Sequence, residues 1–118
     1  MNNLVDLPSL LSLTFGSYTF QNDRTVIIEE LPLLEHLSIG QYSFRISYNW
    51  KGDGYFEIRN CPSLIDVVVG GNAFYDFNKF IMTNLSFIQT FTTGGFSFYY
   101  ISTLVLSSMY YFYYLNQL

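Results

Sequence analysis

Serine, histidine and aspartate side chains that lie next to one another can act as nucleophile, general base and orienting acid in hydrolysis. Ser12, His36 and Asp66 stand at equivalent positions of a repeating pattern, and Thr90 follows them. If the repeats stack, these side chains form a row with a spacing of about 4.8 Å. Hydrolysis also needs a pocket and oxyanion donors, which an open sheet face does not supply. We therefore predict a polar row in which His36 pairs with Asp66, and neither catalytic residues nor enzymatic activity.

A second outward row accompanies the first, because the pattern alternates with a period of two. It consists of Thr14, Ser38, Val68 and Thr92. We predict that this face, together with an inserted loop, binds a protein partner whose identity the sequence leaves open. The candidate partner-binding residues are Ser12, Thr14, His36, Ser38, Asp66, Thr90 and Thr92 on the face, and Trp50, Lys51 and Asp53 in the loop.

The composition argues against several other classes of function. The chain has one histidine and one cysteine, and its carboxylates follow no metal-ligand spacing. The stretch that begins at Lys51 (KGDG) is too short and wrongly ordered for a phosphate-binding or calcium-binding loop. We therefore predict no metal and no cofactor. A net charge of −4 without a basic stripe argues against nucleic-acid binding.

The compartment stays open, although two features favour an intracellular location. Cys61 is the only cysteine, so no internal disulfide can form. The first residues lack the basic region and the small-residue cleavage site of a signal peptide. The uncharged stretch from Ser97 to Leu115 is long enough to cross a membrane, but it is rich in Tyr, Ser and Thr and the repeat runs through it. We expect no membrane span there.

The repeat is carried by three residue types that keep one rhythm. Proline, glycine and phenylalanine each recur with one longer step between two equal shorter steps, and a serine takes the last place of the proline column. Agreement between independent columns is strong support for a repeat architecture. The columns are Pro8, Pro32, Pro62 and Ser86; Gly16, Gly40, Gly70 and Gly94; and Phe20, Phe44, Phe74 and Phe98.

Each repeat contains two stretches of apolar alternation, which predict two short parallel strands per coil. Leu37/Ile39 and Val67/Val69 illustrate the first stretch, and Val26/Ile28 the second. We expect an all-β, right-handed solenoid of about four coils of 24 residues, with two parallel sheets facing each other about 10 Å apart. The predicted coils are 7–30, 31–60, 61–84 and 85–109, with 110–118 either a tail or the start of a further coil, within one domain spanning 1–118.

The longer step in the three columns predicts a loop insertion over 45–55, since the other repeats lack this segment. Insertions in stacked repeats are pushed out as loops, often on the binding face. Elsewhere we expect Gly70 and its column to turn the chain at positive φ. The phenylalanine column is expected to stack inside the core. Cys61 is expected to be buried, and Glu29 is expected to pair with Arg59.

The spacing from Leu64 through Val67, Val69 and Asn72 to Phe74 resembles the leucine-rich repeat, L-x-x-L-x-L-x-x-N-x-L. The element G-x-x-[AS]-F, as in Gly70 to Phe74, is similar to the BspA-like branch of that superfamily, although a glycine replaces the proline that usually follows the first strand there. The resemblance implies a solenoid scaffold for protein–protein or adhesion contacts, without catalytic residues.

Two functions remain open from the sequence. The first is a protein-binding scaffold. The second is a structural, self-associating segment of a longer repeat array or adhesin, because neither end of the repeat carries a polar cap. In the second case we expect end-to-end self-association, and the chain would be a fragment of a longer protein.

Overall fold

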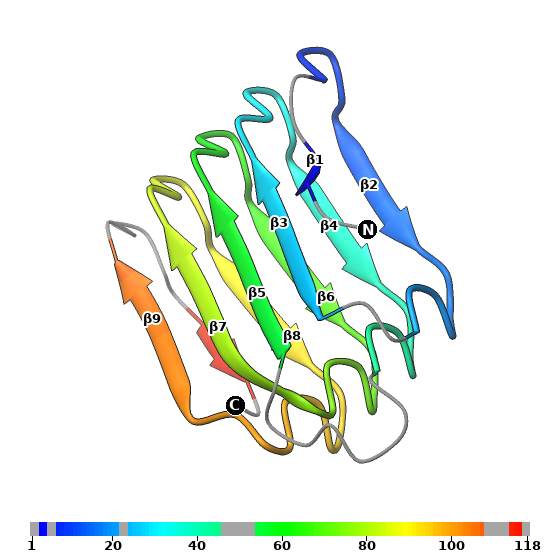
Figure 1. Ribbon diagram of the computed structural model, residues 1–118. Helices are drawn as coiled ribbons and strands as arrows, with labels where there is room; N and C mark the ends of the chain where they lie inside the picture. The colour runs from blue at the N-terminus through cyan, green and yellow to red at the C-terminus, as the bar shows by residue number, and fades with distance from the viewer. Residues whose placement is uncertain (1–2, 5–6, 22–23, 46–53, 108–113, 117–118) are drawn as a thin grey trace.

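The computed structural model describes residues 3–4, 7–21, 24–45, 54–107 and 114–116. These residues form ten strands and no helix (Figure 1). The described part of the chain is therefore all-β, as predicted. The strands are β1 (Asn3–Leu4), β2 (Ser12–Phe15), β3 (Thr25–Glu29), β4 (His36–Ile39), β5 (Gly54–Arg59), β6 (Asp66–Val69), β7 (Phe77–Thr83), β8 (Thr90–Thr93), β9 (Thr103–Ser107) and β10 (Tyr114–Asn116).

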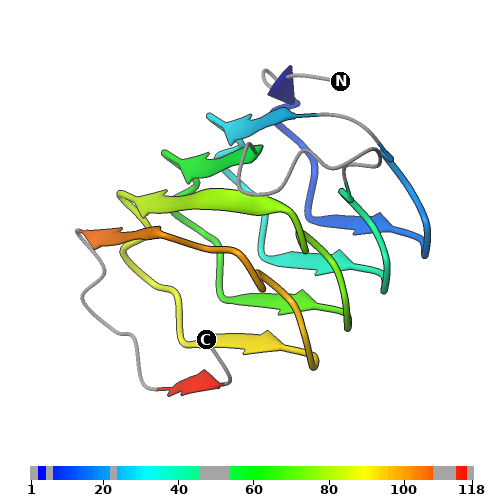
Figure 2. The same cartoon turned by 60° about the horizontal axis from the view of Figure 1, so that its bottom comes forward.

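The strands are divided between two parallel sheets, which confirms the predicted architecture of facing sheets (Figure 2). The odd-numbered strands form one sheet in the order β1-β3-β5-β7-β9, and the even-numbered strands form the other in the order β2-β4-β6-β8-β10. We call these the odd sheet and the even sheet. The chain passes from one sheet to the other at every strand, and one passage through both sheets is called a circuit here.

The strand register follows the spacing of the sequence pattern. Ser12 pairs with His36, His36 with Asp66, Asp66 with Thr90, and Thr90 with Tyr114. These offsets repeat the steps of the proline, glycine and phenylalanine columns, so the longer step is absorbed between β4 and β6 without a change of register. Equivalent residues of successive circuits therefore lie side by side.

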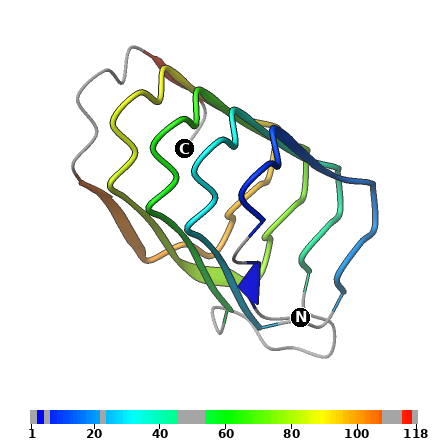
Figure 3. The ribbon, with the colours of Figure 1, turned by 90° about the horizontal axis from the view of Figure 1, so that it is seen from above.

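The core lies between the sheets because alternate residues of each strand point inward. Seen from above, the chain runs round this interior from one sheet to the other (Figure 3). Inward side chains of the middle circuits are 0–2% exposed, which removes nearly all of their apolar surface from water. They include Val26, Ile28, Leu37, Ile39, Phe56, Ile58, Val67, Val69, Phe80 and Met82.

The phenylalanine column forms one interior file, as predicted. The ring centroids of Phe20 and Phe44 are 5.1 Å apart, those of Phe44 and Phe74 4.8 Å, and those of Phe74 and Phe98 5.0 Å. All three pairs are stacked, with interplanar angles of 18°, 5° and 3°. Each circuit thus contributes one ring to a continuous aromatic contact across the stack.

The prediction that the glycine column supplies positive φ is wrong. None of the described glycines has a φ in the left-handed region. Glycine is required there by close approach, because a Cβ on Gly40 would lie 2.5 Å from the backbone nitrogen of Ser17. A Cβ on Gly70 would overlap the backbone nitrogen of Gln41. Gly40 and Gly70 therefore let their circuits pack against the backbone of the preceding one.

The residues with left-handed φ instead include the phenylalanine column, with 50° at Phe20, 54° at Phe44 and Phe98, and 55° at Phe74. The residues two positions after the glycines, Tyr18, Tyr42, Asn72 and Phe96, are left-handed as well. This conformation costs about 1–2 kcal/mol for a residue with a Cβ. Hydrogen bonds between circuits offset the cost: Phe44 N–H donates to the Thr19 carbonyl oxygen at 2.8 Å, and Phe74 N–H to that of Ser43 at 3.0 Å.

The last two residues of the predicted insertion, Gly54 and Tyr55, belong to β5. The pairing of β5 with β7 shifts register between them, since Gly54 faces Phe77 while Tyr55 faces Lys79. Residues 46–53 lie outside the described part of the chain. None of the described residues belongs to a helix that is long and apolar enough to cross a membrane.

Candidate functional site

The outer face of the even sheet brings together the seven predicted face residues that lie on its strands. β2, β4, β6 and β8 place one row at Ser12, His36, Asp66 and Thr90. The second row stands two residues further along each strand. Its members are Thr14, Ser38, Val68 and Thr92, and all of them are exposed or half-buried.

His36 and Asp66 form the pair that the sequence predicts. The His36 Nδ1 atom lies 2.7 Å from the Asp66 Oδ2 atom, and half of the histidine side chain is exposed. The other ring nitrogen, Nε2, lies 3.8 Å from Glu35 Oε1. No hydrogen bond joins Ser12 to this ring in the part of the chain that the structure describes. The described row therefore presents hydroxyls and a carboxylate–imidazole pair on the outer face of the even sheet.

The predicted loop residues Trp50, Lys51 and Asp53 lie outside the described residues. The described residue before this segment is Arg45, whose guanidinium carbon is 5.7 Å from the ring centroid of Tyr42 and 4.7 Å from that of Tyr75. These distances are typical of cation–π contacts.

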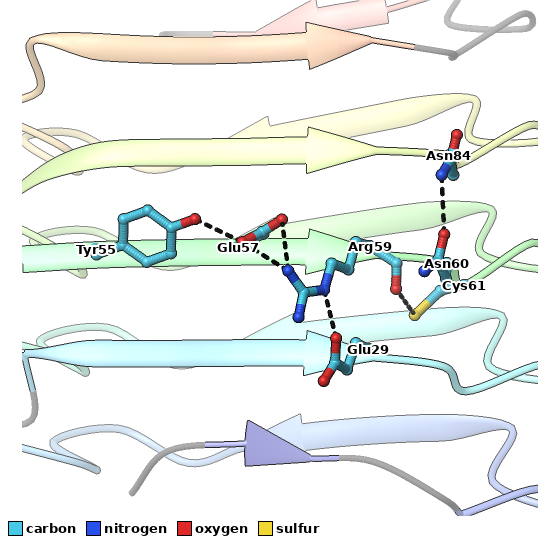
Figure 4. A network of polar contacts seen from close by, with 7 residues as sticks. All are labelled: Glu29, Tyr55, Glu57, Arg59, Asn60, Cys61 and Asn84. Atoms are coloured by element: carbon cyan, nitrogen blue, oxygen red, sulfur yellow. Dashed lines mark hydrogen bonds and ion pairs between the residues drawn. The ribbon is translucent and has the colours of Figure 1, made fainter.

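The outer face of the odd sheet carries a second polar cluster, which extends across β3 and β5 (Figure 4). Arg59 pairs with Glu29 of the neighbouring strand, as predicted. Arg59 Nη1 also lies 3.4 Å from Glu57 Oε2, and the Tyr55 hydroxyl donates to Glu57 Oε1 at 2.5 Å. The Arg59 guanidinium thus lies between two carboxylates, and the Glu57 carboxylate also accepts a hydrogen bond from the Tyr55 hydroxyl.

The cluster shifts the pKa of two of its members upward. The hydrogen bond to Glu57 raises the pKa of Tyr55 above 10.0, and burial and the negative charge of Glu57 add to the shift. The hydrogen bond to Glu29 raises the pKa of Arg59 above its usual range. Both shifts favour the protonated forms, so the phenol acts as a hydrogen-bond donor rather than as a base.

Sequence reasoning missed Tyr55 and Glu57 as members of this cluster. Glu57 is only 8% exposed although it points away from the core, and the strand register places it between Ile27 and Ile81. A signal was present, because Tyr55, Glu57 and Arg59 alternate along one strand and must share its face.

A third polar feature lies at the corner that follows the odd strands. Asn84 Nδ2 donates to Asn60 Oδ1 at 2.9 Å, so the amides of two successive circuits are joined. They line an open groove of about 660 Å³. The groove is lined by Glu30, Pro32, Asn60, Pro62, Asn84 and Ser86.

Cys61 is buried with no exposed surface, as predicted. Burial raises the pKa of its thiol above 9.0, and the thiol lies 3.5 Å from the carbonyl oxygen of Arg59. A thiol in this environment packs as a small apolar side chain. Among the described residues, no group of three or more His, Cys, Asp and Glu side chains is placed to hold a metal ion.

Comparison of the chain with protein-family models, with curated proteins and with solved structures gives no match.

The Tyr55–Glu57 contact predicts a specific alkaline instability. Because the pKa of Tyr55 is higher in the folded state, the unfolded state loses this proton first when the pH rises above about 10. The contribution of the contact to stability is therefore complete below that pH and decreases above it. We expect urea unfolding midpoints between pH 8 and 11 to decrease more steeply for the wild type than for Tyr55→Phe. Glu57→Gln removes the charge that adds to the shift and should give an intermediate slope. Equal slopes for the wild type and Tyr55→Phe would contradict this assignment.

Proposed function

We propose that the chain is a non-catalytic, protein-binding leucine-rich-repeat scaffold of the BspA-like type, wound as a right-handed solenoid. The spacing from Leu64 to Phe74 supports the repeat type. The strand register, whose offsets repeat the steps of the sequence columns, supports a regular winding. The partner is a protein, and it contacts the outer face of the even sheet together with the loop that contains Trp50.

The observation that carries this proposal is the contrast between the two faces of the even sheet. Its inward positions repeat the same kind of residue, as in Leu37, Val67 and Phe91, which are fully buried. The outward positions in the same register change from serine to histidine, aspartate and threonine. Burial explains the residue types at the inward positions but not those at the outward positions. A flat, accessible row of varied side chains fits recognition of a protein surface.

The proposal is tested with variants that change one face at a time. Immobilised wild-type protein, a His36→Ala/Thr90→Ala variant and a Thr83→Ala variant are exposed to a lysate of the source organism, and retained proteins are quantified by mass spectrometry. Thr83 lies on the odd sheet, in register with Arg59, and serves as the matched control. We expect a partner that the wild type and the control retain and the double variant loses. Circular dichroism confirms that all three are folded. Equal retention by all three, or no retained protein at all, would contradict the proposal.

A second candidate is self-association through the ends of the stack. Within the described residues, β2 forms one edge of the even sheet, and Leu7 and Leu11 beside it are 43% and 53% exposed. At the opposite end, Leu104 is 41% exposed although its partner in register, Phe80, is fully buried. Open edges with apolar neighbours favour pairing with another chain. Sedimentation velocity separates the candidates, since a monomer at all concentrations contradicts the second.

A further inference from the structure

The groove at the corner after the odd strands is independent of the even-sheet face. Glu30, Asn60 and Asn84 directly follow β3, β5 and β7, and Figure 4 places Asn60 and Asn84 at the ends of neighbouring strands. All three residues have φ of 55–56°. The backbone N–H groups of Glu30 and Asn60 donate to the next circuit at 3.3 Å. The groove thus has a row of three exposed polar residues, one at the same corner of each successive circuit.

The row has hydrogen-bonding capacity left over. The amide contact uses one N–H of Asn84 and the oxygen of Asn60. Among the described residues no partner takes the two N–H donors of Asn60, the oxygen of Asn84 or the Glu30 carboxylate. Free acceptors therefore lie at the Glu30 carboxylate and the Asn84 oxygen, and free donors lie at the Asn60 amide and at the second N–H of Asn84. The amide orientations follow from the hydrogen-bond network.

The lining selects the chemical class of a ligand. None of its described residues carries a positive charge, and the Glu30 carboxylate repels anions. Hydroxyl groups suit the row because each can donate to an acceptor and accept from a donor. Pro32 and Pro62 add apolar ring surface beside it, against which the C–H face of a sugar ring can pack.

The spacing of the row distinguishes between two kinds of extended ligand, a peptide and an oligosaccharide. Successive circuits are about 4.8 Å apart, whereas an extended or polyproline chain advances about 3.1–3.4 Å per residue. An extended chain of pyranose units advances by nearly the distance between circuits. We propose that this groove binds a neutral oligosaccharide along the stacking direction, with one sugar unit at each circuit.

The proposal is tested by calorimetric titration of the whole chain with cellohexaose and maltohexaose. Asn60→Asp keeps the shape of the side chain and the acceptor for Asn84 but removes the two free donors. Asn72→Asp is the matched control, because Asn72 also has a left-handed φ of 61° and does not line the groove. We expect saturable binding of at least one hexasaccharide, about tenfold weaker in Asn60→Asp because of the lost hydrogen bonds and nearly unchanged in Asn72→Asp.

A second measurement keeps the proposal open to refutation if Asn60→Asp does not fold. In the wild-type protein, nuclear magnetic resonance follows the side-chain amide signals of Asn60 and Asn84 during the same titrations. Saturable shifts of these signals support the proposal. Absence of binding by both hexasaccharides would overturn it, as would binding that leaves the two amide signals unmoved. Saturable binding of a proline-rich peptide in place of both sugars would overturn the assignment of the ligand class.

Discussion

Replacing Phe74 by alanine is expected to lower the free energy of unfolding by about 4 kcal/mol. Phe74 has no exposed surface, and its ring stacks between Phe44 at 4.8 Å and Phe98 at 5.0 Å. The edges of Phe56 and Phe77 meet it at centroid distances of 4.5 and 5.0 Å. Removing the Phe74 ring leaves a cavity. Because neighbouring rings surround this cavity on several sides and are held by stacked strands, it can collapse only in part. Denaturant unfolding followed by circular dichroism measures the loss.

Phe20→Ala is the control, because Phe20 belongs to the same phenylalanine column and is its first ring. It is only partly buried and stacks on one neighbour, Phe44. Both residues have a left-handed φ, so the backbone effect of alanine largely cancels in the comparison. We expect the loss at Phe20 to be about half of that at Phe74 or less. Equal losses would mean that the rings are not coupled as one buried file.

The two facing sheets could be predicted because burial alone determines the alternation of each strand. Val67 and Val69 must point inward, and equivalent residues in other circuits fix the neighbours with which they pack. The register of β4 and β6 followed from the same columns, so the contact between His36 and Asp66 was predictable as well. Period and register are one-dimensional properties of a sequence, and these parts of the structure depend on nothing else.

The cluster around Glu57 depends on neighbours in two dimensions and was missed for that reason. Its low exposure results from Tyr55 and Arg59 on its own strand and from Ile27 and Ile81 on the adjacent strands. When the sequence of one strand is considered alone, an outward glutamate such as Glu57 is predicted to be exposed to solvent. Only the assembled sheet shows that its carboxylate is enclosed and paired.

The left-handed phenylalanines were missed because intrinsic preference argues against them. Phe74 adopts this conformation since its N–H donates to Ser43 of the preceding circuit and its ring stacks on Phe44. Tertiary contacts outweigh local preference there. The phenylalanines and the residues two positions after each glycine take the positive φ of the turn. The glycine column therefore does not supply it, and the close approach of successive circuits becomes the reason for its recurrence.

Gly70→Ala is expected to lower the free energy of unfolding by about 3 kcal/mol, through overpacking between two circuits. The new Cβ would overlap the backbone nitrogen of Gln41, and it would lie 2.8 Å from the Gln41 Cα and from the carbonyl carbon of Gly40. These are backbone atoms, so no side-chain rotation can relieve the contact. The β4–β6 pairing must shift instead, and thermal or denaturant unfolding measures the cost.

Gly16 offers the matched control within the same column. A Cβ there meets nothing within 4 Å, and neither Gly16 nor Gly70 has a left-handed φ. Gly16→Ala therefore carries no steric cost, and the reduced entropy of the unfolded chain should stabilise the protein by a few tenths of a kcal/mol, at most about 1 kcal/mol. The two substitutions are expected to have opposite signs. A loss at Gly16 as large as that at Gly70 would mean that glycine serves a backbone conformation after all, and close packing of successive circuits would no longer explain the column.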